Sequence, residues 1–278
     1  MGIWLTGWHW HADQVTGIGL LLAAYLWGVG PLRRRYRWAK RVEIRRVAAF
    51  LSALVVLFVA IASPIHVVAE QLFSFHMLQH VLLVLGVAPL LLVGTPGWLL
   101  RPLLRFGPLL HVARLVTHPV VAFGLFSAVF ALWHVPALYD LATAVEAVHI
   151  WEHMAFLVTG VMVWWPIMGP LPELHRLSDP GQMLYLVILS VSQTPLFAFI
   201  TFSGHVLYPW YAGGPRLWGL SALADQQLSG VIMKVPFLVA FVTLLAVVFF
   251  RWFSREEEAA KEDGREQPGP VGNTTSAR

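Results

Sequence analysis

Two pairs of histidines stand four residues apart, each at the start of a long apolar segment. One pair is His76 and His80, and the other is His149 and His153. Residues four apart lie on one face of an α-helix, a turn from each other, so both imidazoles of a pair can reach one ion. If their helices are neighbours, the two pairs could supply four nitrogen ligands to a metal.

The composition restricts which other ligands are available. The chain contains no cysteine, which excludes disulfides and thiolate ligands. A soft metal would therefore be held by imidazole, thioether or carboxylate groups. Neutral imidazole suits copper and zinc, and ligand type alone does not choose between these two ions.

Further histidines are expected near the ends of apolar segments that lie on the same side of the membrane as the two pairs. His134 ends the fourth apolar segment within a Trp-His-Val-Pro sequence, and we include it among the metal ligands. His9 and His11 stand in a Trp-His-Trp-His run, which either lends ligands or anchors the chain at the membrane surface. Ordinary hydrogen bonds to loop carbonyls or water are expected for four others: His66, His118, His175 and His205.

Carboxylates on the same side could orient the imidazoles. A ligating histidine commonly donates its second N–H to a carboxylate, which fixes the tautomer of the ring. We assign this supporting role to three residues: Asp140, Glu152 and Asp225. For Asp225, which precedes the last apolar segment, the alternative is ordinary capping of a helix N-terminus.

Membrane-spanning helices must position these residues. Of the 278 residues, 58% are hydrophobic and 12% are charged, a composition outside the range of soluble domains. Apolar runs of about 18 to 20 residues, the length that crosses the hydrocarbon, recur along the chain. We predict an all-α polytopic bundle of about seven transmembrane helices, at 14–32, 47–65, 76–94, 119–137, 149–168, 182–203 and 230–252.

Basic residues predict the orientation of this bundle. Lys and Arg that flank spans stay in the cytoplasm, and all of the 19 except Arg216 and Lys234 fall on one side. This distribution predicts an N-terminus outside, a cytoplasmic C-terminus and histidine pairs near the outer face. The net charge of +4 then reflects topology and attraction to anionic lipid, and it gives no support for nucleic-acid binding.

The domain organisation follows from the same pattern. Residues 1–253 are expected to form one transmembrane domain. The segment 254–278 is rich in Glu, Gly, Pro, Ser and Thr, a composition that cannot bury enough apolar surface to order itself. We predict a disordered cytoplasmic tail there.

Other chemistries remain open for the same residues. The order His149, Glu152, His153 matches inverted zinc peptidases, in which two histidines hold zinc and the glutamate activates water. Heme is a third possibility, although axial ligation would leave one histidine of each pair unused. A structural or transport role without metal would rely on polar residues such as Lys234 and Asp225.

Several motifs also carry a resemblance to a known family. They are, in order, His76-Met77-Leu78-Gln79-His80, Gly94-Thr95-Pro96, the run Trp133–Asp140, His149 with Glu152-His153, Trp164-Trp165-Pro166 and Asp225-Gln226-Gln227-Leu228. With them the chain resembles the CtaG-type cytochrome c oxidase assembly factors, multi-pass proteins of the bacterial cell (inner) membrane. Lys234 departs from the family pattern, which has an apolar or aromatic residue there, and neighbouring Met233 is given no binding role.

The resemblance implies a non-catalytic role in maturing a heme–copper oxidase. Copper would be bound at the outer face and delivered to a cytochrome c oxidase subunit after transfer from an extracytoplasmic copper donor. Membrane lipid is the remaining partner that the resemblance and the composition imply.

Overall fold

The computed structural model describes residues 12–266, and every regular element in this range is a helix. Six helices there are long and apolar enough to cross a membrane, and a bent pair makes a seventh if it counts as one span. Each predicted segment overlaps one of these spans. The prediction of an all-α, multi-pass membrane protein is therefore confirmed.

The helices follow one another through short connections, with η1 and η2 π-helical and η3 and η4 of the 3-10 type. They are α2 (Ala12–Trp27), η1 (Gly28–Leu32), α3 (Arg33–Tyr36), α4 (Ile44–Ala62), α5 (Pro64–Ala69), α6 (Phe73–Val81), η2 (Leu82–Val87), α7 (Ala88–Gly94), α8 (Gly97–Leu100), η3 (Leu103–Arg105), α9 (Gly107–Val116), α10 (Pro119–Trp133), α11 (Pro136–Ala144), α12 (Glu146–Met168), α13 (Asp179–Ser192), α14 (Thr194–Phe202), α15 (Pro209–Gly213), η4 (Leu217–Gly219) and α16 (Ala222–Glu266).

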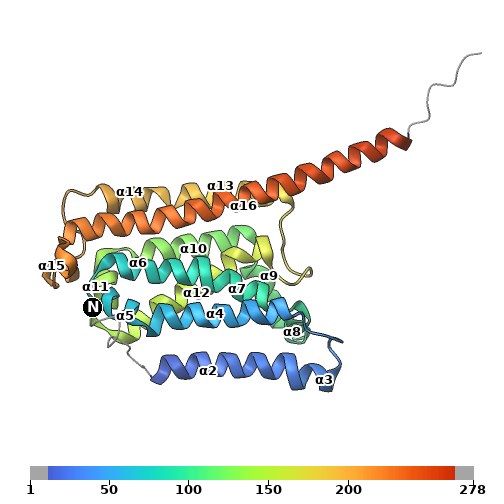
Figure 1. Cartoon of the computed structure of the whole chain (residues 1–278), viewed down its shortest axis with the longest axis horizontal. Helices are drawn as coiled ribbons and strands as arrows, with labels where there is room; N and C mark the ends of the chain where they lie inside the picture. Colours follow the sequence, from blue (N-terminus) through green and yellow to red (C-terminus); the bar gives the residue numbers. More distant parts are fainter. Residues whose placement is uncertain (1–11, 267–278) are drawn as a thin grey trace, which may run out of the picture.

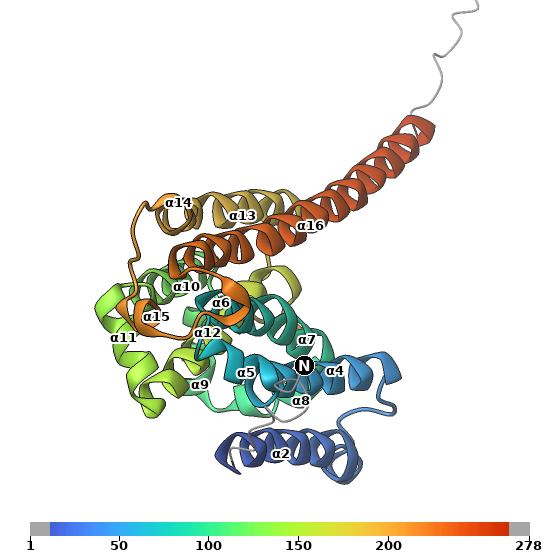
Figure 2. The same ribbon diagram turned by 60° about the vertical axis from the view of Figure 1, so that its left-hand side comes forward.

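The continuous helix formed by α6, η2 and α7 lies at the centre of the bundle. Figures 1 and 2 show it between α2 on one side and α13, α14 and α16 on the other. In its most apolar stretch 56% of the residues are buried, against 17% in that of the peripheral span that begins with α2. Polar side chains on such an enclosed helix are costly unless they have polar partners or a function. The histidines of α6 are such groups.

A π-helical segment interrupts this central helix soon after His80. In η2 the ladder shifts from i+4 to i+5, and the Val84 carbonyl accepts a hydrogen bond from the Trp164 indole at 2.7 Å. Such bulges occur often at functional sites. The shift rotates α7 relative to α6 and so changes which of their residues face α12.

Close packing at the other end holds α4 against α7. A Cβ at Gly94 would lie 2.5 Å from the backbone nitrogen of Phe50, so only glycine fits there. The Gly94 carbonyl also accepts a hydrogen bond from the Tyr25 hydroxyl at 3.0 Å, and the Tyr25 ring stacks on Phe50. This contact joins α2, α4 and α7.

Prolines interrupt two of the predicted spans. The fourth is shorter than predicted, because α10 ends at Trp133 before Pro136 begins α11, and α9 joins α10 at a bend of 69°. In the sixth, α13 ends at Ser192, and Pro195 is the second residue of the new helix α14. A proline ring disfavours helical geometry at the residue before it and removes a backbone donor.

The tail differs from its prediction. The structure continues α16 through Glu266, so residues 254–266 are helical, where disorder was expected from 254. This part is rich in Glu and also contains Ala, Arg and Lys, all of which favour helix. Lys261 pairs with Glu257 one turn away at 2.6 Å. The predicted tail from 267 on, and His9 and His11 at the other terminus, lie outside the described residues.

Candidate metal centre

The two predicted histidine pairs meet between α6 and α12. The ring centroid of His76 lies 5.1 Å from that of His149 and 5.5 Å from that of His153. The ring of His80 lies 5.4 Å from that of His153. The convergence that the spacing suggested is therefore present, at the end of the bundle where α5 and α15 also lie, which we call the histidine end (Figure 1).

The cluster offers two groups of three ligand atoms that share His76. In one group, nitrogens of His76, His149 and His153 lie within 4.8 Å of one another. In the other, Glu152 Oε1 lies 3.4 Å from His76 Nε2 and 3.5 Å from His80 Nε2. Two ligands at about 2.1 Å from one ion are at most about 4.2 Å apart. The two distances from Glu152 satisfy this limit, and the ligand atoms of each group all lie within 4.8 Å of one another, so at most a small side-chain movement is needed in either group.

Glu152 was predicted only to orient the imidazoles, but it lies close enough to them to share an ion with them. Its side chain is fully buried (0% exposed), and both of its oxygens lack a hydrogen-bond partner in the described part of the chain. A buried carboxylate without a partner is among the costliest groups in a protein interior. The carboxylate faces two imidazoles at ligand distance, so it can bind an ion directly.

Most partnerless buried polar atoms gather in this cluster. Thirteen side-chain N and O atoms of the described residues are buried without a hydrogen bond, and seven belong to the five residues His76, His80, His149, Glu152 and His153. Native proteins keep such atoms few, since each costs about 1–3 kcal/mol. A cation with nitrogen and carboxylate ligands would satisfy them together, so this donor set fits copper or zinc.

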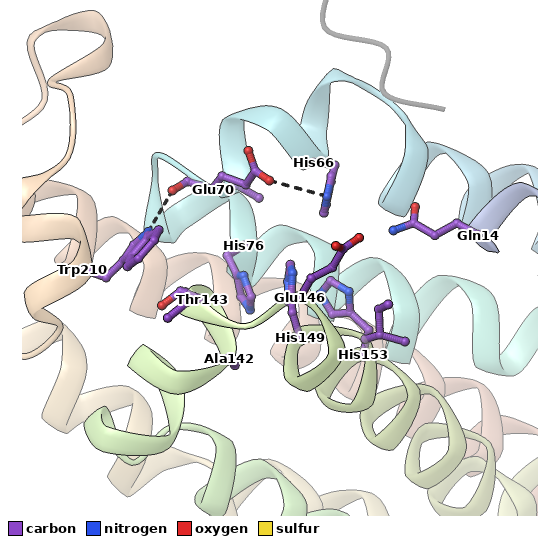
Figure 3. Close-up of a pocket in the computed structure, with 13 residues that line it drawn as sticks. Gln14, His66, Glu70, His76, Ala142, Thr143, Glu146, His149, His153 and Trp210 are labelled. Carbon is purple, nitrogen blue, oxygen red and sulfur yellow. Dashed lines mark hydrogen bonds and ion pairs between the residues drawn. The ribbon is translucent and has the colours of Figure 1, made fainter. Parts of the chain in front are cut away.

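A cavity of about 400 Å³ gives access to the cluster from the histidine end. Figure 3 shows His76, His149 and His153 among the residues that line it, and the lining also includes the exposed residues Glu70 and Glu146. Carboxylates at an opening raise the local concentration of cations. The first ligand group therefore faces the cavity, whereas the group with His80 and Glu152 lies deeper.

His66 lies on the cavity wall, although only hydrogen bonds to loop carbonyls or water were predicted for it. Its ring is buried and stacks on that of His149 at 5.7 Å between centroids. Its Nδ1 lies 3.3 Å from the Gln79 amide nitrogen, and its Nε2 lies 3.9 Å from Glu70 Oε1. Only one feature of the sequence pointed to this position: His66 stands at the same end of its span as the two pairs.

His134 lies beside the cluster but belongs to neither ligand group. Its Nδ1 lies 2.6 Å from the Phe130 carbonyl oxygen, and its Nε2 lies 3.3 Å from Met77 Sδ. Its ring centroid is 6.3 Å from that of His80. The three other histidines with ordinary predicted roles stay away from the cluster: His205 is exposed, and His118 packs against His175 near α9.

The two aspartates predicted to orient imidazoles act elsewhere. The Asp225 carboxylate accepts hydrogen bonds from the backbone N–H groups of Phe73 at 2.7 Å and Ser74 at 3.2 Å. It thus caps the N-terminus of α6, whereas the sequence pattern suggested capping of its own helix. Asp140 makes no hydrogen bond to an imidazole within the described residues, and one of its oxygens is buried without a partner.

A tyrosine cluster covers the site and was not anticipated from the sequence. The Tyr139 ring packs on His76, and its hydroxyl lies 2.9 Å from the Tyr211 hydroxyl. Tyr211 donates to the Ala69 carbonyl at 2.9 Å, and Tyr208 donates to the His134 carbonyl at 3.0 Å. Burial raises the pKa of Tyr139 well above its ordinary value, so this hydroxyl remains protonated.

Lys234, the departure from the expected pattern, points away from the cluster. Its ammonium donates to the Ser190 carbonyl at 2.6 Å and to the Thr194 hydroxyl at 2.9 Å. These partners lie where α13 gives way to α14. Lys234 thus binds to the break in the sixth span.

Comparison with known proteins identifies the family. The sequence model of the cytochrome c oxidase caa3 assembly factors matches residues 23–255. The chain belongs to this family. The resemblance drawn from the motifs is therefore confirmed, and the matched range contains both histidine pairs and Glu152.

Three curated relatives of this chain are mycobacterial proteins that are named as uncharacterized. The chain is 28% identical over 278 residues to proteins of Mycobacterium bovis and Mycobacterium tuberculosis, and 25% identical over 276 residues to one of Mycobacterium leprae. Each match covers 92% of this chain but only 41% of the relative. No solved structure matches the chain.

Proposed function

We propose that this protein binds copper at its histidine end and delivers it to a subunit of a heme–copper cytochrome c oxidase during assembly. The convergence of two helix-spaced histidine pairs and the buried Glu152 carries the proposal, together with the family. Copper is the cargo here, and the protein is not an enzyme.

The two ligand groups provide a means of passing the ion. An ion held by His76, His149 and His153 faces the cavity, where a donor or acceptor can reach it. Because His76 also belongs to the deeper group with His80 and Glu152, the ion can move by exchanging one ligand at a time. Three-coordinate sites leave a position for an incoming ligand, unlike closed structural sites.

The proposal includes an orientation with the histidine end outside the cytoplasm. Its support is the distribution of basic residues, which gather in the connections and helix ends away from the cluster, with Arg216 and Lys234 as exceptions. An extracytoplasmic copper donor would then meet the cavity directly. The oxidase subunit would receive copper on the same side.

The geometry also bears on the heme alternative. Heme iron between two axial imidazoles would need a macrocycle between their rings. The rings of His76 and His149 instead stack at 5.1 Å between centroids with 20° between their planes. Nitrogens of imidazoles that lie this close can bind one bare ion, so copper or zinc is favoured over heme.

The experiment uses a bacterium that naturally encodes this chain. Its gene is deleted, and oxidase activity and the copper content of the purified oxidase are measured after complementation. The wild type should restore both, whereas His149→Ala/His153→Ala should yield oxidase poor in copper that excess copper in the medium partly rescues. The exposed His205→Ala is the matched control. Full copper loading by the double variant would contradict the proposal, and proteolysis lost in Glu152→Gln would instead support a zinc peptidase.

A further inference from the structure

A second set of imidazole and thioether groups lies on the side of α6 that faces α10 and α16. Met77, His80, His134 and Met233 line a small cavity there, together with apolar and aromatic side chains. Its volume of about 10 Å³ is close to the least that holds one water-sized particle. All four residues are buried, with Met77 0% exposed. The imidazole and thioether groups are therefore enclosed with almost no room for solvent.

The hydrogen bond of His134 fixes which of its nitrogens carries the proton. The Phe130 carbonyl, 2.6 Å from Nδ1, can only accept, so Nδ1 must donate. In the neutral ring, Nε2 then holds a lone pair. That nitrogen faces Met77 Sδ at 3.3 Å, and a thioether sulfur has no proton to give.

This contact therefore joins two electron-pair donors with no hydrogen between them. Metal–nitrogen bonds of about 2.0–2.1 Å and metal–sulfur bonds of about 2.3 Å, at angles near 100°, separate the two ligand atoms by about 3.3 Å. The observed separation of 3.3 Å has this value. The pair is already spaced as two ligands of one ion.

His80 connects this pair to the cluster already described. Both of its ring nitrogens are buried without a hydrogen bond, and its Nε2 lies 3.5 Å from Glu152 Oε1. Its ring centroid lies 6.3 Å from that of His134, across the small cavity. A rotation of the His80 ring could thus bring one nitrogen toward the thioether side.

We infer that Met77, His134 and His80 form a second metal subsite, selective for monovalent copper, with the Met233 thioether on the cavity wall. Thioether ligands select copper(I), whereas zinc is served as well by imidazole and carboxylate alone. The subsite would distinguish these two ions, between which the ligand types of the nitrogen and carboxylate cluster do not choose. The inference rests on the proposed function for its supply of copper, which would arrive through His76 and His80.

The test is X-ray absorption of the purified full-length chain loaded anaerobically with copper(I), with silver(I) as a second soft probe. The wild type should show a sulfur neighbour at about 2.3 Å. Met77→Leu keeps the volume of the side chain. This variant should lose the sulfur neighbour, and its silver(I) affinity should fall about tenfold or more. Met154→Leu, an exposed methionine beside His153, is the matched control and should behave as the wild type.

Zinc binding separates this inference from the proposed function. Met77→Leu should retain the zinc stoichiometry of the wild type, which also shows that the variant folds. A wild-type copper(I) spectrum with only nitrogen and oxygen neighbours, or a Met77→Leu spectrum equal to the wild type, would overturn the inference. Silver(I) binding that needs Met77 in a protein whose histidine cluster binds no metal would support the inference and contradict the proposed function.

Discussion

Replacing Glu152 by Gln should preserve the metal-free protein while removing most of the stabilisation that copper provides. The carboxylate is fully buried, and within the described residues its oxygens accept no hydrogen bond. Its polar neighbours include His76 Nε2 and His80 Nε2, at 3.4 and 3.5 Å. Gln matches the carboxyl group in size and adds no charge that burial would penalise, whereas the same change deprives a bound cation of its anionic ligand.

The size of the effect follows from binding linkage. Free copper at 100 times its Kd stabilises the folded chain by about 2.7 kcal/mol. If the loss of the carboxylate weakens binding about 100-fold, the same copper concentration equals the new Kd and stabilises by about 0.4 kcal/mol. The difference of about 2.3 kcal/mol corresponds to a Tm change of about 5–9 °C for a chain of this size.

Thermal unfolding in detergent, followed by tryptophan fluorescence, measures both quantities. Metal-free Glu152→Gln should unfold at or above the wild-type Tm, and its copper-induced increase should nearly vanish. Glu258→Gln is the matched control, because Glu258 is an exposed carboxylate on α16 that does not line the cavity. A lower metal-free Tm with an undiminished copper increment would refute the reasoning, since Glu152 would then stabilise the fold without binding the ion.

Three further predictions concern the scaffold. Asp225→Ala should lower the free energy of unfolding by about 1–2 kcal/mol, because it leaves two N–H groups of α6 uncapped; equal chemical denaturation of both proteins would contradict this. Gly94→Ala should cost about 1–3 kcal/mol, since its Cβ would clash with α4, whereas Gly124→Ala meets open space and should not destabilise; similar Tm values would count against the packing. In this cysteine-free chain, an impermeant maleimide should label Glu146→Cys but not Ser254→Cys in intact cells, and the reverse pattern would invert the proposed orientation.

The features predicted well from the sequence are those set by local spacing. Apolar runs of spanning length predicted each membrane helix, because a helix in lipid must be apolar over that length. The i, i+4 spacing placed His76 with His80 and His149 with His153 on single helix faces. That α6 and α12 are neighbours depends on packing across the bundle, which spacing within one segment does not encode.

The features that were missed depend on long-range contacts. Asp225 caps a helix about 150 residues earlier in the chain, at 2.7 Å from the backbone nitrogen of Phe73. Glu152 was expected to orient imidazoles, yet rotation along α12 aims it between His76 and His80. The composition of the tail as a whole hid a helix-forming first half, because Gly, Pro, Ser and Thr concentrate after residue 266.

Metal analysis of the purified protein tests the central claim most directly. The chain is loaded with copper, freed of excess by gel filtration and compared with a variant in which His76, His80, His149 and His153 are all Ala. We predict at least about one equivalent of copper per wild-type chain and almost none in the variant. Wild-type protein that retains no copper, or a variant that retains as much as the wild type, would contradict the claim.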